Sequence, residues 1–259
     1  METLATAVSR FAKPIRLHNE RDKAMNRPGN GTVTVRNDPR RTIGALTTEE
    51  RQWGWPTVAA GLVATVSYAL MASVHGTDPG SLAVQLLLAF AFAFALSIVS
   101  IGLYFVAGGP RSNPVALVGA VFNVVAGALL LTMALVQLSM KSVADPPGEM
   151  FRAVYFGLDV AWDLYIGSGT LLFAIALRKH DWFRGRFAWP GVVVSLALIV
   201  LNIVTFPKPP ASSGLIDPGP LVGLWYTAVS VWIAYKLLRH GGRDRLIEAE
   251  PPSRALTAG

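Results

Sequence analysis

The sequence contains no cysteine, few histidines and little charge. Its 259 residues include no Cys, four His and 15% charged residues. The lack of cysteine excludes disulfides, thiolate metal sites and iron–sulfur clusters. The four histidines fall outside the long apolar stretches, which argues against a haem held between membrane histidines. The zinc-peptidase motif HExxH is also absent. We therefore expect neither a cofactor nor a bound metal.

The N-terminal region lacks the apolar core of a cleavable signal. Residues 1–50 contain no apolar run of about seven residues or more. They are basic and are interrupted by Pro28, Gly29, Asn30 and Gly31. We expect residues 1–52 to form a basic, largely disordered cytoplasmic arm. The alternative for residues 2–17 is an amphipathic helix that lies on the inner leaflet.

Long apolar stretches make up most of the remaining chain, in which 52% of all residues are hydrophobic. A helix needs roughly 20 mostly apolar residues to cross the hydrocarbon core. The sequence therefore predicts an all-α fold, a polytopic membrane bundle of six transmembrane helices within residues 53–240. Residues 241–259 are expected to form a disordered cytoplasmic tail. The six stretches lie at about 55–74, 82–107, 115–140, 153–177, 187–206 and 220–238.

Positive charges avoid every second connection between these stretches. Of the 23 Lys and Arg residues, all but Lys141, Arg152 and Lys208 lie in the N-terminal region, in the alternate connections or in the end of the chain from Lys236 on. Connections rich in Lys and Arg stay in the cytoplasm during insertion, so both termini are predicted to be cytoplasmic. The net charge of +7 follows from this asymmetry, and we expect no nucleic-acid partner. The basic ends are expected to contact a lipid bilayer with anionic headgroups.

The three predicted outer turns share an Asp-Pro pair, which occurs at Asp78, Asp145 and Asp217. Asp is a favoured N-cap, and Pro is suited to the first position of a helix. Helix capping explains all three pairs. The alternative is that the three carboxylates gather into an outer cation site.

Small residues at helical spacing predict where the helices pack against one another. Three stripes of this kind occur, one in each of the second, third and fourth stretches. They consist of Ala89, Ala93 and Ser97; of Gly119, Asn123 and Gly127; and of Ala153, Gly157 and Ala161.

Two acidic residues, Asp159 and Asp163, fall deep within an apolar stretch. Their spacing of four places both carboxylates on one helix face, about one turn apart. Counted from Arg152, they lie roughly 10 Å and 16 Å below the outer surface. A carboxylate at such a depth costs about 2.5–3.5 kcal/mol on insertion scales. We expect the pair to hold a proton, to share one or to bind a cation.

Other polar residues are predicted to lie at a similar depth. Gln137, Asn202 and Tyr155 fall in the outer half of their helices, so the candidate proton or cation pocket consists of Asp159, Asp163 and these three residues. Three further residues, Gln85, Tyr68 and Tyr226, also belong to the outer half. Asn123 lies deeper, with Ser97, Ser195 and Thr170 near a path toward the inside. The alternative is structural: buried Asp residues can hydrogen-bond across helices and set their packing.

The pattern of spans, with the segments Gly157–Asp163 and Asn202–Pro220, resembles bacterial six-span integral membrane proteins of unknown function. The resemblance implies a multi-pass protein of the bacterial cytoplasmic membrane, that is, the cell inner membrane. It implies no activity.

Three functions remain open from the sequence. The first is a small proton- or cation-linked carrier or sensor that uses the Asp pair. The second is a non-enzymatic membrane partner subunit or assembly factor, with a protein partner or a homo-oligomer. The third is a lipid enzyme, since Asp159 and Asp163 resemble one magnesium–diphosphate motif of membrane prenyltransferases. The second acidic motif of those enzymes is absent, so the sequence does not favour an enzyme.

Overall fold

The structure is a computed structural model that describes residues 46–108, 113–142, 148–178, 180–183 and 185–249, with the backbone alone for 241–249. Within these residues there are helices and no strand. Six long helices are joined by connections that include a short 3₁₀ helix, η2 (Ala211–Ser213). The long helices are α2 (Thr48–Ser73), α3 (Pro79–Val106), α4 (Pro114–Lys141), α5 (Glu149–Leu177), α6 (Ala188–Thr205) and α7 (Gly219–Ala249).

All six long helices are long and apolar enough to cross a membrane. The predicted fold class, an all-α bundle of six membrane helices, is confirmed. The borders of the bundle differ from the prediction. α2 begins at Thr48, so residues 48–52 are helical, and α7 continues to Ala249 through the start of the predicted tail. Residues 1–45 of the predicted arm and 250–259 of the tail lie outside the described residues.

Local sequence signals explain where the helices begin. Thr47 and Glu50 form a reciprocal capping box at the start of α2. Asp78 caps α3 by accepting a hydrogen bond from the Ser81 backbone N–H at 3.0 Å, as the Asp-Pro pattern predicts. Asp217 accepts one from the backbone of Gly219, the first residue of α7, at 2.8 Å. The third Asp-Pro turn, at Asp145, lies outside the described residues.

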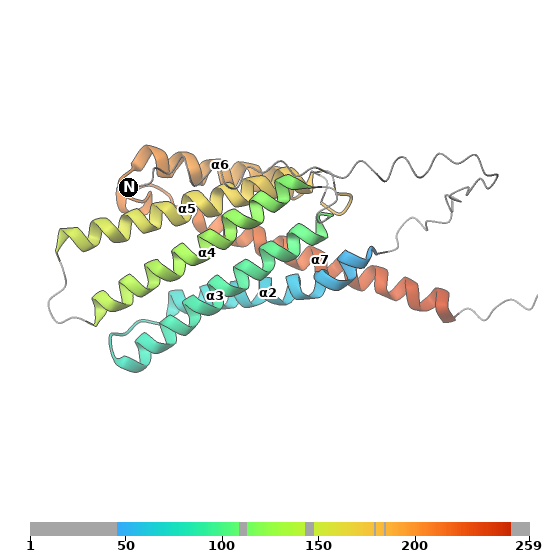
Figure 1. Cartoon of the computed structure of the whole chain (residues 1–259), viewed down its shortest axis with the longest axis horizontal. Coiled ribbons are helices and arrows are strands. Elements are labelled where there is room, and N and C mark those ends of the chain that lie inside the picture. The colour runs from blue at the N-terminus through green and yellow to red at the C-terminus, as the bar shows by residue number, and fades with distance from the viewer. Residues whose placement is uncertain (1–45, 109–112, 143–147, 179, 184, 250–259) are drawn as a thin grey trace, which may run out of the picture. The chain divides into compact units, whose positions relative to one another are not determined.

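Neighbouring helices in the chain also pack side by side, from α2 through to α6 (Figure 1). α7 then packs mainly against α2 and less extensively against α6 and α5. A hydrogen bond of 2.8 Å between the Thr65 and Thr227 hydroxyls joins α2 to α7. We call the end of the bundle where α3, α5 and α7 begin the predicted outer end, and the opposite one the predicted inner end.

Two of the three small-residue stripes are packing seams. Ala89 and Ala93 on α3 are buried, as are Gly119, Asn123 and Gly127 on α4. A Cβ atom added to Gly127 would lie 3.0 Å from the Ala93 carbonyl oxygen. The backbones of α3 and α4 therefore approach closely along these stripes.

The predicted stripe on α5 is wrong. Ala153 and Gly157 are exposed, and a Cβ atom added to Gly157 would meet nothing within 4 Å. The packed face of α5 instead carries Gly167 and Gly169, where an added Cβ at Gly169 would overlap the Asn123 Oδ1 atom. Small residues at helical spacing can occur on more than one face of a helix. The pattern alone therefore does not show which face packs against a neighbour.

Candidate functional site

The candidate site is centred on the two carboxylates of α5. Asp163 is buried and Asp159 is half-buried. Asp163 Oδ2 accepts a hydrogen bond of 3.0 Å from Nδ2 of Asn202, a fully buried residue of α6. The same Asn202 nitrogen donates to the Leu198 carbonyl at 3.0 Å. The structure thus brings together two helices and two of the predicted site residues.

Tyr155 and Gln137 form the outer part of the site. The Tyr155 phenol lies near the Gln137 side chain and interacts electrostatically with Asp159 and Asp163. Tyr155 precedes Asp159 by one helical turn on the same face of α5. Gln137 comes from α4 and reaches the carboxylates only through Tyr155. All five predicted site residues therefore belong to one neighbourhood, although only Asp163 and Asn202 are directly bonded.

A third carboxylate, that of Asp217, lies near the pair. It interacts electrostatically with both Asp159 and Asp163. Tyr68 of α2 is within electrostatic reach of all three carboxylates. The sequence predicts helix capping for Asp217, with an outer cluster of Asp78, Asp145 and Asp217 as the alternative. The structure gives Asp217 both a capping role and a place beside the pair, whereas Asp78 is exposed and bonds to Ser81.

Asp163 lies close to the outer ends of two helices. Asn202, its partner, precedes the end of α6 at Thr205 by three residues, or about 5 Å along the axis. α7 begins just after Asp217, part-way along α5 (Figure 1). The depth of roughly 16 Å was counted along α5 alone. This depth is larger than the distance from Asp163 to the outer end of α6. The reason is that α5 extends further toward the predicted outer end than α6 does.

The carboxylates of the site have no cationic partner in the described part of the chain. Neither Asp159 nor Asp163 forms an ion pair with a described Lys, Arg or His side chain. No group of three His, Cys, Asp or Glu side chains among the described residues is arranged to hold a metal ion. The described groups around the pair are the Asn202 amide, which is hydrogen-bonded to Asp163, two phenols and the Asp217 carboxylate. The Oδ1 atom of Asn202 is buried and has no hydrogen-bond partner among the described residues.

A second polar cluster lies further along the bundle and joins three helices. Asn123 Nδ2 of α4 donates to the Tyr226 hydroxyl of α7, and the Tyr226 and Thr170 hydroxyls share a hydrogen bond of 3.3 Å. Tyr226, predicted to belong with the outer group, thus lies with Asn123. Ser97 and Ser195, which were predicted to line a path, donate to carbonyls of their own helices at 3.0 and 2.5 Å.

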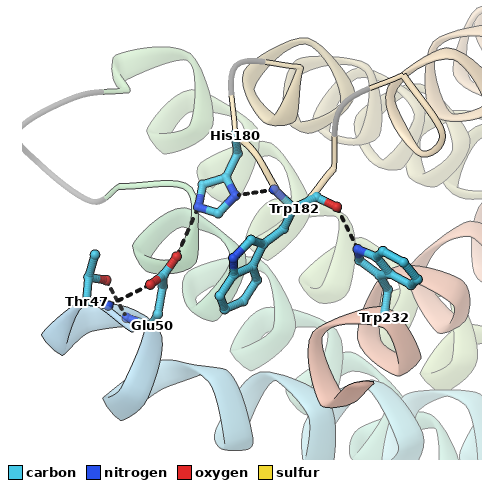
Figure 2. A network of polar contacts seen from close by, with 5 residues as sticks. All are labelled: Thr47, Glu50, His180, Trp182 and Trp232. Carbon is cyan, nitrogen blue, oxygen red and sulfur yellow. Dashed lines mark hydrogen bonds and ion pairs between the residues drawn. The ribbon is translucent and has the colours of Figure 1, made fainter. Parts of the chain in front are cut away.

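A third polar cluster lies at the predicted inner end and was not predicted from the sequence (Figure 2). His180, between α5 and α6, contacts Glu50 of α2, with 3.3 Å between Nε2 and Oε1. The Trp182 carbonyl accepts a hydrogen bond of 2.6 Å from Nε1 of Trp232 on α7. No sequence signal links residues so far apart in the chain.

Comparison with known proteins gives no family for this chain. No protein-family model, curated protein or solved structure matches it. The resemblance to bacterial six-span membrane proteins therefore stays a prediction, and the argument for function depends on the geometry of the site.

Proposed function

We propose that this multi-pass membrane protein is a small proton- or cation-linked carrier or sensor, and that Asp159 and Asp163 take up the proton or cation. The observation that carries the proposal is the buried Asp163 carboxylate. It is held by a neutral amide and has no cationic partner among the described residues. Buried charges are normally paired or coordinated, so this carboxylate is suited to a partner from outside the chain.

The neighbouring carboxylates strengthen this reasoning. Asp159 and Asp217 add like charge within electrostatic reach of Asp163. Carboxylates that share a site cannot all ionise without a large cost. A bound proton or cation removes part of that cost, and the free Oδ1 atom of Asn202 provides one more acceptor.

The arrangement favours binding from the predicted outer end over an open channel. Asp217 and the end of α6 lie beside the pair at that end. Between this site and the Asn123 cluster, no hydrogen bond joins the described side chains in a continuous chain. A sensor needs access from one end only, whereas a carrier needs a second conformation that opens the other end.

The test is ligand-dependent stability of the purified full-length chain in lipid nanodiscs. Thermal unfolding is measured against pH and against Na⁺, K⁺, Ca²⁺ and methylammonium at constant ionic strength. A ligand at 100 times its Kd stabilises the native state by about 2.7 kcal/mol. We expect Asp163→Asn to abolish the stabilisation by the cation and the part of the pH dependence that Asp163 contributes, since Asn keeps the shape and still accepts from Asn202.

Asp78→Asn is the matched control, because Asp78 is an exposed carboxylate at the same end and Asn also caps helices. This variant should respond to each cation as the parent does, and to pH above about 6, where the Asp78 carboxyl is ionised. An Asp163→Asn protein that responds to every ion and to pH as the parent does would refute the proposal. That outcome, together with a second protein that co-purifies from native membranes, would support the alternative, a non-enzymatic partner subunit or assembly factor.

A further inference from the structure

The connection between α5 and α6 is attached to two other helices at the predicted inner end (Figure 2). On one side His180 contacts Glu50 of α2. On the other side the Trp182 carbonyl binds the indole N–H of Trp232 on α7. The two attachments are themselves joined, because the Trp182 backbone N–H donates to His180 Nδ1 at 3.3 Å.

These contacts determine the protonation state of the imidazole. A nitrogen that accepts a hydrogen bond carries no proton, so Nδ1 is unprotonated. The ring proton of the neutral imidazole therefore lies on Nε2, which is 3.3 Å from Glu50 Oε1. Both nitrogens of the imidazole have a partner in this arrangement.

A second proton has to bind at Nδ1, because Nε2 already carries one. The Nδ1–H group would then face the Trp182 N–H group, and their hydrogen bond would be lost. At the same time the contact with Glu50 would change from one between a neutral ring and a carboxylate to an ion pair between two opposite charges. Protonation therefore strengthens one attachment and breaks the contact that positions Trp182.

We propose that Glu50, His180, Trp182 and Trp232 form a proton-operated latch, called here the His180 latch. With a neutral ring, the α5–α6 connection is attached to both α2 and α7. With a protonated ring, it is attached to α2 through Glu50, and the Trp182 carbonyl leaves Trp232. A proton thereby changes which helices this connection joins.

The surroundings of the latch allow this change. The His180 and Glu50 side chains are 19% and 9% exposed, so protons can reach the ring while the ion pair remains partly shielded. Glu50 is fixed in place because its Oε2 atom accepts a hydrogen bond of 2.6 Å from the Thr47 backbone. The His240 ring of α7 stacks on Trp182 with centroids 6.3 Å apart. Among the described residues, charged neighbours in the chain include Glu49 and Arg51, beside Glu50, and Asp181, beside His180. Lys236 lies over the Trp232 ring.

The indole of Trp232 offers a direct readout. The full-length chain, labelled with 5-fluorotryptophan in lipid nanodiscs, is followed by ¹⁹F NMR between about pH 8 and pH 5, the range in which histidine changes charge. The Trp232 resonance is assigned with Trp232→Phe, and the exposed Trp55 is the internal reference. We expect the Trp232 resonance to shift with a single midpoint in the parent protein.

Three histidine variants identify the group responsible. His180→Gln keeps a donor and an acceptor but does not titrate, so the Trp232 shift should disappear. His75→Gln, at the predicted outer end, and His240→Gln, beside Trp182, should keep the shift. A shift that persists in His180→Gln, that disappears in His240→Gln or that is absent from the parent would overturn the latch.

Glu50→Gln gives a second test if His180→Gln does not fold. Gln still completes a capping box with Thr47 but offers the imidazolium no counter-charge. The midpoint should therefore move to lower pH in this variant. An unchanged midpoint would count against the latch.

Discussion

Two glycines of α5 allow a direct test of which face of this helix packs. A Cβ atom at Gly169 would overlap Asn123 Oδ1 and would lie 3.0 Å from the Gly119 carbonyl oxygen. A Cβ atom at Gly157 would meet nothing within 4 Å. The same substitution, Gly→Ala, is therefore predicted to have opposite effects at two positions of one helix.

The expected magnitude at Gly169 follows from these contacts. Overpacking a filled site costs about 1–3 kcal/mol, and displacing Asn123 from Tyr226 loses a hydrogen bond worth about 0.5–1.5 kcal/mol. In the opposite direction, Ala stabilises the interior of a helix by about 0.5–1 kcal/mol relative to Gly. We expect Gly169→Ala to lower the free energy of unfolding by about 1–3 kcal/mol. Gly157→Ala should be neutral or should raise it by up to about 1 kcal/mol.

The assay is reversible unfolding in mixed micelles, with helix content followed by circular dichroism. The double variant Gly169→Ala with Asn123→Ala separates the two parts of the cost. Removing the Asn123 side chain should recover part of the loss, while the approach to the Gly119 carbonyl remains. Equal stabilities for Gly169→Ala and Gly157→Ala would refute the assigned packing of α4 against α5.

Two further predictions concern single contacts. Hydrogen bonds from the Ser81 side chain and backbone lower the pKa of Asp78. The ionised Asp78 should therefore stabilise α3 above the ordinary carboxyl pKa and lose this contribution as the pH falls through its lowered pKa. The difference in thermal midpoint between the parent and Asp78→Ala should shrink between about pH 6 and pH 3, and a constant difference would contradict this. The second contact is the hydrogen bond between Thr65 and Thr227. A double-mutant cycle in which each Thr is replaced by Val should give a coupling free energy of about 0.6 kcal/mol. Zero coupling would show that the bond does not stabilise the α2–α7 contact.

The start of α3 was predictable because its cause is local: the Asp78 side chain accepts a hydrogen bond from a backbone N–H of the first helical turn. The capping box of Thr47 and Glu50 is equally local, but the apolar pattern used for the prediction placed the start of α2 later, at about residue 55. The seam of α5 was not predictable, because small residues occur on more than one of its faces. Gly157 and Gly169 look alike in the sequence, and only the position of Asn123 distinguishes them.

Parts of the candidate site were likewise predictable from the sequence, and other parts were not. The spacing of Asp159 and Asp163 along one helix was enough to place them on one face. Asn202 was included because of its depth, and its bond to Asp163 depends on how α6 is rotated about its axis. The place of Asp217 beside the pair depends on where the chain returns between α6 and α7.

The sequence by itself determined that six helices form and roughly where they begin and end, because the length of an apolar run and the chemistry of a cap are properties of neighbouring residues. Only the tertiary structure decided which faces of those helices meet. It placed Asn202 on Asp163 and His180 on Glu50, residues that are far apart in the chain. The physical reason is that contacts between helices depend on their rotation and relative depth, and every side chain along the interface contributes to these together.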